Sequence, residues 1–131
     1  MIVVDASVIV AILLRAEPMD HLAQRLDEAR GILHAPHLLD VEVYQALRRF
    51  SLADEIELTR CAEAQKDFYG LPIIRYPHTD LLERAWELRS NLTIYDGIYV
   101  ALAEALDAQL WTQDSKLAKA VRKLTKVKVL D

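Results

Sequence analysis

Four acidic residues stand next to apolar stretches of a kind that proteins bury. They are Asp5 in MIVVDASV, Glu42 in LLDVEVYQALRR, Asp96 in LTIYDGIYVALAEAL and Asp114 in LWTQDSKL. A buried charge is costly without a partner, and carboxylates gathered in one pocket repel one another and raise each other's pKa. A hard divalent cation such as Mg²⁺ or Mn²⁺, which prefers oxygen ligands, resolves that conflict. If the fold brings the four acids together, they predict a metal site.

Each acid also has a purely structural interpretation. Asp5, Asp96 and Asp114 stand near the starts of expected helices, where aspartate is a favoured N-cap and complements the positive end of the helix. Glu42 could point to solvent from the edge of its helix. Spacing does not decide between these interpretations, because the four positions are far apart in the sequence.

Short apolar runs alternate with helical patterns along the chain, which predicts an α/β domain with a mostly parallel sheet. We expect strands at 2–4, 32–35, 73–75, 110–112 and 127–130. The periodicity of apolar residues predicts helices at 7–15, 20–30, 38–52, 55–68, 79–89, 96–106 and 115–124, with the third and fourth forming a hairpin. Asp5 and Asp114 then follow strands that end at one edge of the sheet, where ligand sites of α/β proteins form.

Size and composition fit one domain over residues 1–131. The chain is 53% hydrophobic and 27% charged, with a net charge of −4. No stretch free of charge approaches the roughly 20 residues of a membrane span. The N-terminus has no basic flank of the signal-peptide kind, so we expect a cytoplasmic protein. The single cysteine, Cys61, excludes an internal disulfide and is interpreted as a packing residue.

The distribution of charge and of aromatic residues gives weaker indications. Residues 112–131 carry six basic and two acidic side chains, whereas the rest of the chain is acidic. A basic end could contact phosphates, but we favour a solvated helix face. Trp86, Trp111, Tyr95 and Tyr99 stand among apolar neighbours. We expect all four in the core, although a tyrosine could instead stack on a nucleic-acid base.

At the four acidic blocks the chain resembles the PIN-domain ribonucleases and, within them, the VapC toxins of prokaryotic toxin–antitoxin pairs. The resemblance covers VVDASVIVAILLRAE, LLDVEVYQALRR, LTIYDGIYVALAEAL and LWTQDSKL, in the family's order and nearly end to end. It implies a single PIN-like domain with a central, mostly parallel sheet flanked by helices and an acidic pocket at the C-terminal edge of the strands. It assigns a catalytic metal site to Asp5, Glu42, Asp96 and Asp114, with Ser7 and Thr112 as supporting residues.

The resemblance also implies a reaction, namely Mg²⁺- or Mn²⁺-dependent hydrolysis of RNA that leaves 5′-phosphate and 3′-hydroxyl ends. Asp5, Asp96 and Asp114 are expected to bind the metal directly. Glu42 is expected to bind it directly or through water, or to orient the nucleophile. Some relatives carry a further acid shortly after the fourth one, where this chain has Ser115 and then a lysine, so we expect a site of four carboxylates.

The implied partners are an RNA substrate and a VapB-type antitoxin that blocks the acidic pocket, with the hairpin at 38–68 as the antitoxin's groove. The implied assembly is a homodimer or a toxin–antitoxin hetero-oligomer. The bases expected to contact RNA are Lys116, Lys119 and Arg48 or Arg49. Two alternatives stand beside this interpretation: a metal-free PIN-like binding module, and a receiver-type Mg²⁺-binding signalling domain. The receiver alternative requires adjacent N-terminal acids, whereas Asp5 stands alone.

Overall fold

The centre of the fold is strand β1 (Ile2–Val4), whose three β-branched residues are all buried. The computed structural model describes residues 1–15 and 19–131, and within them five strands form one sheet in the order β3-β2-β1-β4-β5. β2 (Leu33–Pro36) and β4 (Gln109–Trp111) flank β1, while β3 (Ile73–Tyr76) and β5 (Val129–Leu130) form the edges. All pairs are parallel, which explains why the inner strands are apolar on both faces.

The strand order reverses at β1. The chain runs outward from β1 through β2 to β3, and then crosses back to add β4 and β5 on the other side. In open α/β sheets a ligand crevice forms at such a switch point, outside the carboxyl ends of the strands. Here the switch point lies between β1 and β4, directly before Asp5 and Thr112. Receiver domains have the order 2-1-3-4-5 instead, so this topology excludes the receiver alternative.

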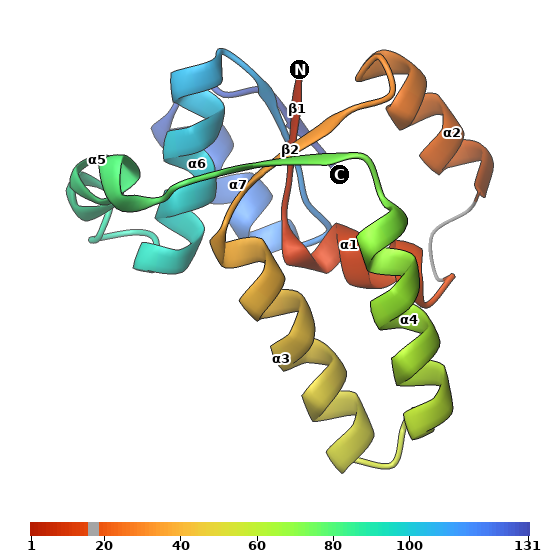
Figure 1. Cartoon of the computed structure of the whole chain (residues 1–131). Coiled ribbons are helices and arrows are strands. Elements are labelled where there is room, and N and C mark those ends of the chain that lie inside the picture. Colours follow the sequence, from red (N-terminus) through yellow and green to blue (C-terminus); the bar gives the residue numbers. More distant parts are fainter. Residues whose placement is uncertain (16–18) are drawn as a thin grey trace.

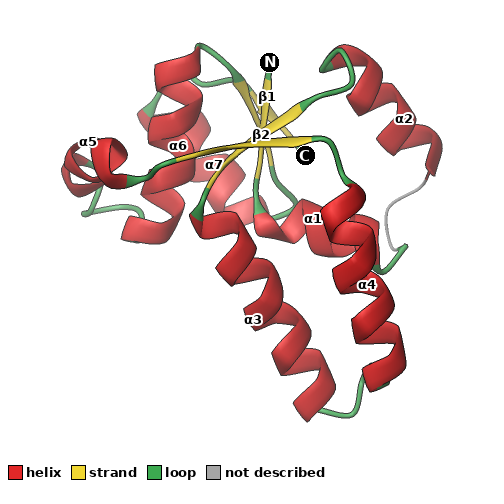
Figure 2. Ribbon diagram, viewed as in Figure 1, coloured by secondary structure: helices red, strands yellow, loops and turns green. Residues whose placement is uncertain are grey.

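Helices cover both faces of the sheet (Figures 1 and 2). On one side lie α1 (Ala6–Leu13), α2 (Met19–Glu28) and a hairpin of α3 (Leu38–Leu52) with α4 (Leu58–Gly70). On the other side lie α5 (Leu82–Glu87), α6 (Ile94–Leu106) and α7 (Ser115–Leu124), with a short 3₁₀ turn at Thr79–Leu81 before α5. α1 packs against α3 and α4, whereas α6 packs against β1, β2 and β4. The starts of α1 and α3 therefore meet α6 at the carboxyl edge of the sheet.

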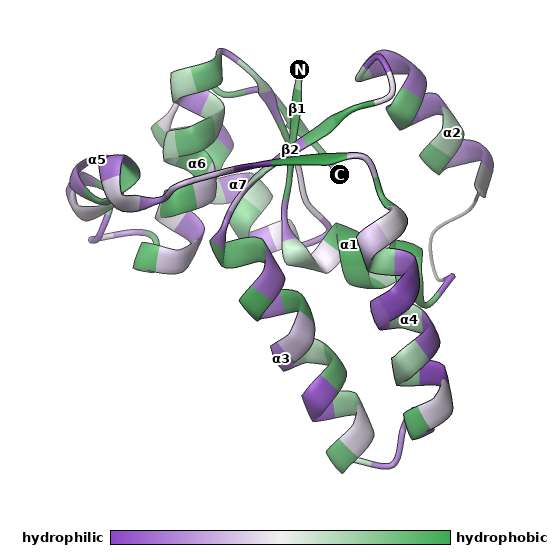
Figure 3. Cartoon of the chain, in the orientation of Figure 1, coloured by the Kyte–Doolittle hydropathy of each residue, from purple (hydrophilic) through white to green (hydrophobic). Residues whose placement is uncertain are grey.

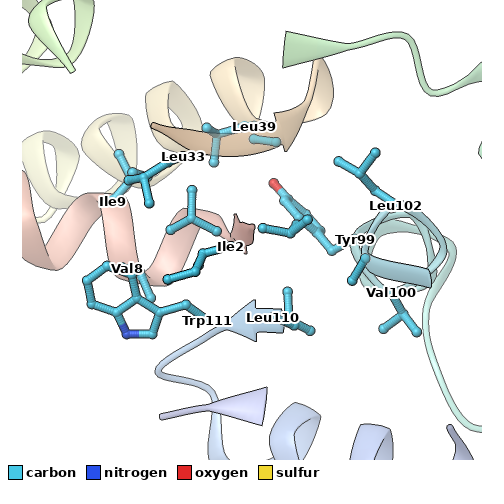
Figure 4. Packing of buried hydrophobic residues seen from close by; sticks show 14 of the residues in the cluster. Ile2, Val8, Ile9, Leu33, Leu39, Tyr99, Val100, Leu102, Leu110 and Trp111 are labelled. Atoms are coloured by element: carbon cyan, nitrogen blue, oxygen red, sulfur yellow. The ribbon is translucent and has the colours of Figure 1, made fainter. Parts of the chain in front are cut away.

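The distribution of hydrophobic residues along each element matches how deeply that element is buried in the fold. β1 and α1 are hydrophobic along almost their whole length, whereas α2 and α4 alternate between hydrophobic and hydrophilic residues (Figure 3). Every residue of α6 from Gly97 to Ala103 is buried, as expected for a helix enclosed by other elements. Trp111 and Tyr99 are the largest fully buried side chains and pack among aliphatic residues of the sheet and of α1 (Figure 4).

Close packing of α6 depends on Gly97. A Cβ atom at this position would lie 3.0 Å from both Cα and Cβ of Ala85 in α5. Glycine therefore lets α5 approach α6 immediately after Asp96. This contact sets how closely the first turn of α6 packs against α5.

The predicted elements match with limited differences. The strand at 2–4 and the helices at 38–52 and 115–124 have the predicted bounds, but the helix expected at 79–89 is a 3₁₀ turn followed by the short α5. Trp86 and Tyr95 are each 60% exposed, so their expected place in the core is wrong, whereas Tyr99 and Trp111 are each 1% exposed. Trp86 lies on the surface under the Arg89 guanidinium, whose carbon is 4.6 Å from the ring centroid.

Two sequence-based expectations about the surface can also be compared with the structure. The bases of α7 are exposed while Leu117, Ala118 and Val121 are buried, which is the pattern of a solvated helix face. Among the helices of residues 1–15 and 19–131, none is both long and apolar enough to cross a membrane.

Candidate active site

A cavity of about 760 Å³ lies where the carboxyl ends of the central strands meet α3 and α6. All four predicted acids line it: Asp5, Glu42, Asp96 and Asp114. They come from four different elements, since Asp5 follows β1, Glu42 lies in α3, Asp96 lies in α6 and Asp114 precedes α7. The fold thus brings together residues that are more than 100 positions apart in the sequence.

Asp5 is the most buried of the four acids, at 6% exposure. Its Oδ1 accepts hydrogen bonds from the Ser7 hydroxyl at 2.5 Å and from the backbone N–H of Val8 at 3.2 Å, so Asp5 is also the N-cap of α1. Its Oδ2 accepts a hydrogen bond from the hydroxyl of Thr112. Both carboxylate oxygens therefore have fixed donors, and the orientation of Asp5 is set by the protein.

Thr112 is fully buried and connects two of the acids. Its Oγ1 donates to Asp5 and accepts the backbone N–H of Asp114 at 3.0 Å. Ser7 has a parallel role, because its Oγ accepts the backbone N–H of Gln113 at 2.9 Å while donating to Asp5. The two hydroxyls tie the end of β1 to the segment that follows β4.

The capping interpretation holds for Asp5 and Asp114 but is wrong for Asp96. Oδ1 of Asp114 accepts the N–H groups of Lys116 at 2.9 Å and Leu117 at 3.1 Å, which caps α7. α6 begins at Ile94, and its N-cap is Thr93, whose Oγ1 accepts the N–H of Asp96 at 3.1 Å. The side chain of Asp96 is thus released from capping and lines the cavity in the first turn of the helix.

Glu42 faces inward because of its position on α3. It lies three residues after the fully buried Leu39, and residues three apart share a helix face. Its Oε1 accepts a hydrogen bond from the hydroxyl of Tyr99 at 2.7 Å, across the gap between α3 and α6. The alternative that Glu42 points to solvent is therefore wrong.

The electrostatics of the cavity are unfavourable for negative charge. Burial raises the pKa of Asp5 above its usual value, although the hydrogen bonds from Ser7 and Thr112 oppose the shift. Burial also raises the pKa of Glu42, and the charges of Asp96 and Asp5 add to that effect. The pKa of Asp96 is raised by burial and by the charges of Asp114 and Asp5. The carboxylates are thus close enough to disfavour one another's ionised forms.

The donor set fits a hard cation, although it is not a closed metal cage. In residues 1–15 and 19–131, no group of three or more Asp, Glu, His or Cys side chains is arranged to hold a metal ion as it stands. Mg²⁺ commonly takes only one or two protein carboxylates and completes its shell with water and substrate phosphate. The four mutually repelling carboxylates of the lining, which offer only oxygen ligands, meet that requirement chemically.

The cavity is also lined by apolar, aromatic and basic side chains. They include exposed Val41, half-buried Phe50, Arg49 and the exposed Tyr95 beside Asp96. Of the bases expected to contact RNA, Arg49 lines this cavity and Arg48 lines a separate one of about 620 Å³ between α3 and α4. The side chains of Lys116 and Lys119 line neither cavity, so their expected place at the pocket is not supported.

Sequence reasoning missed the contact of Tyr99 with Glu42. Tyr99 lies three residues after Asp96 and hence on the same face of α6, which is the one signal in the sequence that could have indicated it. The partner lies 57 positions away, and no local pattern identifies it.

Fold and cavity together define an α/β protein with an acidic site at the switch point of a parallel sheet. The sequence profile of the PIN domain matches residues 2–123. VapC ribonuclease Mb0985 of Mycobacterium bovis is 44% identical over 118 residues, which make up 90% of this chain and 89% of that protein. The chain therefore belongs to the PIN-domain family and, within it, to the VapC ribonucleases.

Solved structures share the fold. PAE2754 from Pyrobaculum aerophilum matches with a TM-score of 0.70 at 24% identity, covering 98% of this chain and 81% of that one. VapC20 of Mycobacterium tuberculosis, described as a sarcin-ricin loop cleaving toxin, matches with a TM-score of 0.66 at 17% identity. That match covers 92% of this chain and 95% of VapC20. At these identities the likeness concerns the fold alone.

Proposed function

We propose that this chain is a metal-dependent endoribonuclease that hydrolyses RNA phosphodiester bonds in the cytoplasm and acts as the toxin of a toxin–antitoxin pair. The observation that carries the proposal is the convergence of four acids from four elements on one cavity at the switch point. The 44% identity to a VapC ribonuclease supports the choice of RNA as the substrate.

In this mechanism Asp5, Asp96 and Asp114 would hold Mg²⁺ or Mn²⁺, and Glu42 would bind it directly or through water, or would orient the attacking water. When bound, the cation lowers the pKa of a water molecule and neutralises charge on the phosphate. The chain supplies orientation, because the hydroxyls of Ser7 and Thr112 fix both oxygens of Asp5. These supporting contacts keep Asp5 from turning toward other donors.

The remaining side chains place the substrate and move the proton. Oε1 of Glu42 is held by Tyr99, which leaves Oε2 to accept the proton of the attacking water. Attack on phosphorus forms the new P–O bond and breaks the bond to the 3′ oxygen, which takes up a proton from solvent, so the products end in 5′-phosphate and 3′-hydroxyl. Arg49 can pair with a neighbouring phosphate, and the exposed ring of Tyr95 can stack on an unpaired base.

The test is cleavage of a labelled single-stranded RNA and of total RNA by the purified chain with Mg²⁺, with Mn²⁺ and with EDTA. We expect cleavage with either cation and none with EDTA. Asp96→Asn should lower the rate by roughly 100-fold or more, since even the outer partners of metal ligands cost about 10–100-fold. The matched control is Asp67→Asn, an exposed aspartate of α4 outside the cavity.

Two results would contradict the proposal. Cleavage that persists in EDTA would exclude a metal-dependent reaction, and equal rates for the Asp96 and Asp67 variants would exclude the cavity as the site. Binding of RNA without cleavage under any of these conditions would instead favour the metal-free binding module.

The proposed partner is a VapB-type antitoxin with a hydrophobic segment. The second cavity, between α3 and α4, is lined by apolar and polar residues of both helices, including Leu47, Cys61 and the 76% exposed Leu58. An amphipathic helix could lie in such a groove and reach the acidic cavity, because Val41 and Gln45 line both. The assembly in this proposal is a homodimer or a hetero-oligomer with the antitoxin.

A further inference from the structure

We propose that Tyr99 is a positioning residue whose hydroxyl holds Glu42 in the orientation in which it serves the acidic cavity. This inference rests on the proposed function and deepens it, because it assigns a role to a residue that is neither a metal ligand nor one of the supporting hydroxyls of Asp5.

The contact joins the two helices that form the walls of the cavity. Tyr99 lies in α6, one turn after Asp96, and its side chain is 1% exposed. Its hydroxyl donates to Oε1 of Glu42 at 2.7 Å. In Figure 4 the ring of Tyr99 extends from α6 with its hydroxyl directed toward α3 near Leu39, one turn before Glu42.

The surroundings of Glu42 explain why it needs such a donor. Glu42 is half buried, and the negative charges of Asp96 and Asp5 disfavour its ionised form. A glutamate side chain loses much rotamer freedom when it is fixed in one place. A hydrogen bond from a buried, rigid ring fixes one oxygen of Glu42 and leaves the other available to the cavity.

Tyr99 could in principle be a core residue that only needs a partner for its hydroxyl. Phenylalanine would fill the same volume without that need, and the hydroxyl is directed at a cavity acid. The chain offers a matched control in Tyr76, a half-buried tyrosine whose hydroxyl lies 2.8 Å from Nδ1 of His34, outside the cavity.

The experiment compares wild type, Tyr99→Phe and Tyr76→Phe by Mn²⁺ titration calorimetry and by single-stranded RNA cleavage. We expect Tyr99→Phe to weaken Mn²⁺ binding and to lower kcat, each by about 10–100-fold, the range measured for outer partners of metal ligands. KM for RNA should change by less than about twofold, and Tyr76→Phe should change neither property. A smaller folded fraction would also lower the apparent kcat at unchanged KM, but in the calorimetry it would lower the stoichiometry of Mn²⁺ binding rather than the affinity.

A double-mutant cycle with Glu42→Gln assigns the effect to this contact. If Tyr99 acts through Glu42, Tyr99→Phe adds almost nothing once Glu42→Gln is present.

The outcomes separate this inference from the proposed function. An active wild type with an unchanged Tyr99→Phe variant would overturn the inference alone. The same holds if Tyr99→Phe has its full effect in the Glu42→Gln background, because Tyr99 would then act elsewhere. A wild type that neither binds Mn²⁺ nor cleaves RNA would overturn the proposed function and this inference with it.

Discussion

Replacing Thr112 by valine tests whether its hydroxyl, which lies between Asp5 and Asp114, holds these two acids in place. Valine has nearly the same shape, so the change removes the hydroxyl without opening a cavity. The variant loses the hydrogen bond to Oδ2 of Asp5 and leaves the backbone N–H of Asp114 without its acceptor. Because Thr112 is 0% exposed, its hydroxyl makes both contacts inside the protein, where losing a hydrogen bond is costly.

The expected magnitude follows from these two contacts. A hydrogen bond to a charged acceptor contributes about 1.5–3 kcal/mol net, and an unpaired backbone N–H costs about 1 kcal/mol more. Thr112→Val should therefore lower the free energy of unfolding by about 3 kcal/mol. For a domain of this size that is a fall in Tm of roughly 9–15 °C, which leaves a typical domain folded.

The assay is thermal and urea unfolding of the metal-free protein at pH 7, with Thr125→Val as the control. Thr125 also donates and accepts through its hydroxyl, but both of its partners are backbone groups, Val121 O at 3.0 Å and Val127 N at 3.1 Å. The control should lose only about 1 kcal/mol. Equal losses in the two variants would refute the reasoning, as would a loss below about 0.5 kcal/mol for Thr112→Val.

The remaining predictions concern charge and packing at the same edge of the sheet. Because the native pKa values of three cavity acids are raised above usual values of 3.8 for aspartate and 4.5 for glutamate, the folded state binds more protons there than the unfolded state. Without divalent cations, stability should therefore fall as the pH rises from about 4 toward neutrality, and Asp96→Asn should flatten this slope in pH-dependent unfolding and raise Tm at pH 7 by a few degrees. A steeper slope in the variant would contradict the assignment. Gly97→Ala should cost about 1–3 kcal/mol in urea unfolding, because its Cβ would lie 3.0 Å from Ala85. The double variant with Ala85→Gly should recover part of that loss, and strict additivity would count against the close contact.

The order of elements and the edge that carries the acids could be predicted from sequence because both depend on local signals. Alternating apolar runs located β1 and β4, and acids that directly follow parallel strands must lie at one edge of the sheet. Two of the three predicted caps are present for the same reason, since Asp5 and Asp114 directly precede their helices. Asp96 is not a cap, because Thr93 starts α6 two residues earlier than the apolar pattern indicates.

Features that depend on tertiary packing could not be predicted in this way. The exposure of Trp86 depends on the short α5, which buries Ala85 against Gly97 and leaves the next residue outside. Tyr95 lies in the first turn of α6, before the enclosed part of the helix that begins at Gly97, so its apolar neighbours in the sequence gave the wrong indication. The bond between Tyr99 and Glu42 joins two helices whose relative position is set by the sheet between them.

The fold partly offsets the electrostatic cost of bringing four acidic side chains together in one cavity. α1, α6 and α7 all begin at the cavity, and each has an aspartate at its N-cap or in its first turn. The positive end of a helix stabilises such an acid by about 0.3–1 kcal/mol, and the backbone donors of Asp5 and Asp114 add to this. The pKa values of Asp5, Glu42 and Asp96 are nevertheless raised, so burial and mutual repulsion exceed these contributions. A cation that binds only the folded state would remove this unfavourable term, so the free energy of unfolding of the wild type should rise with the concentration of Mg²⁺ or Mn²⁺.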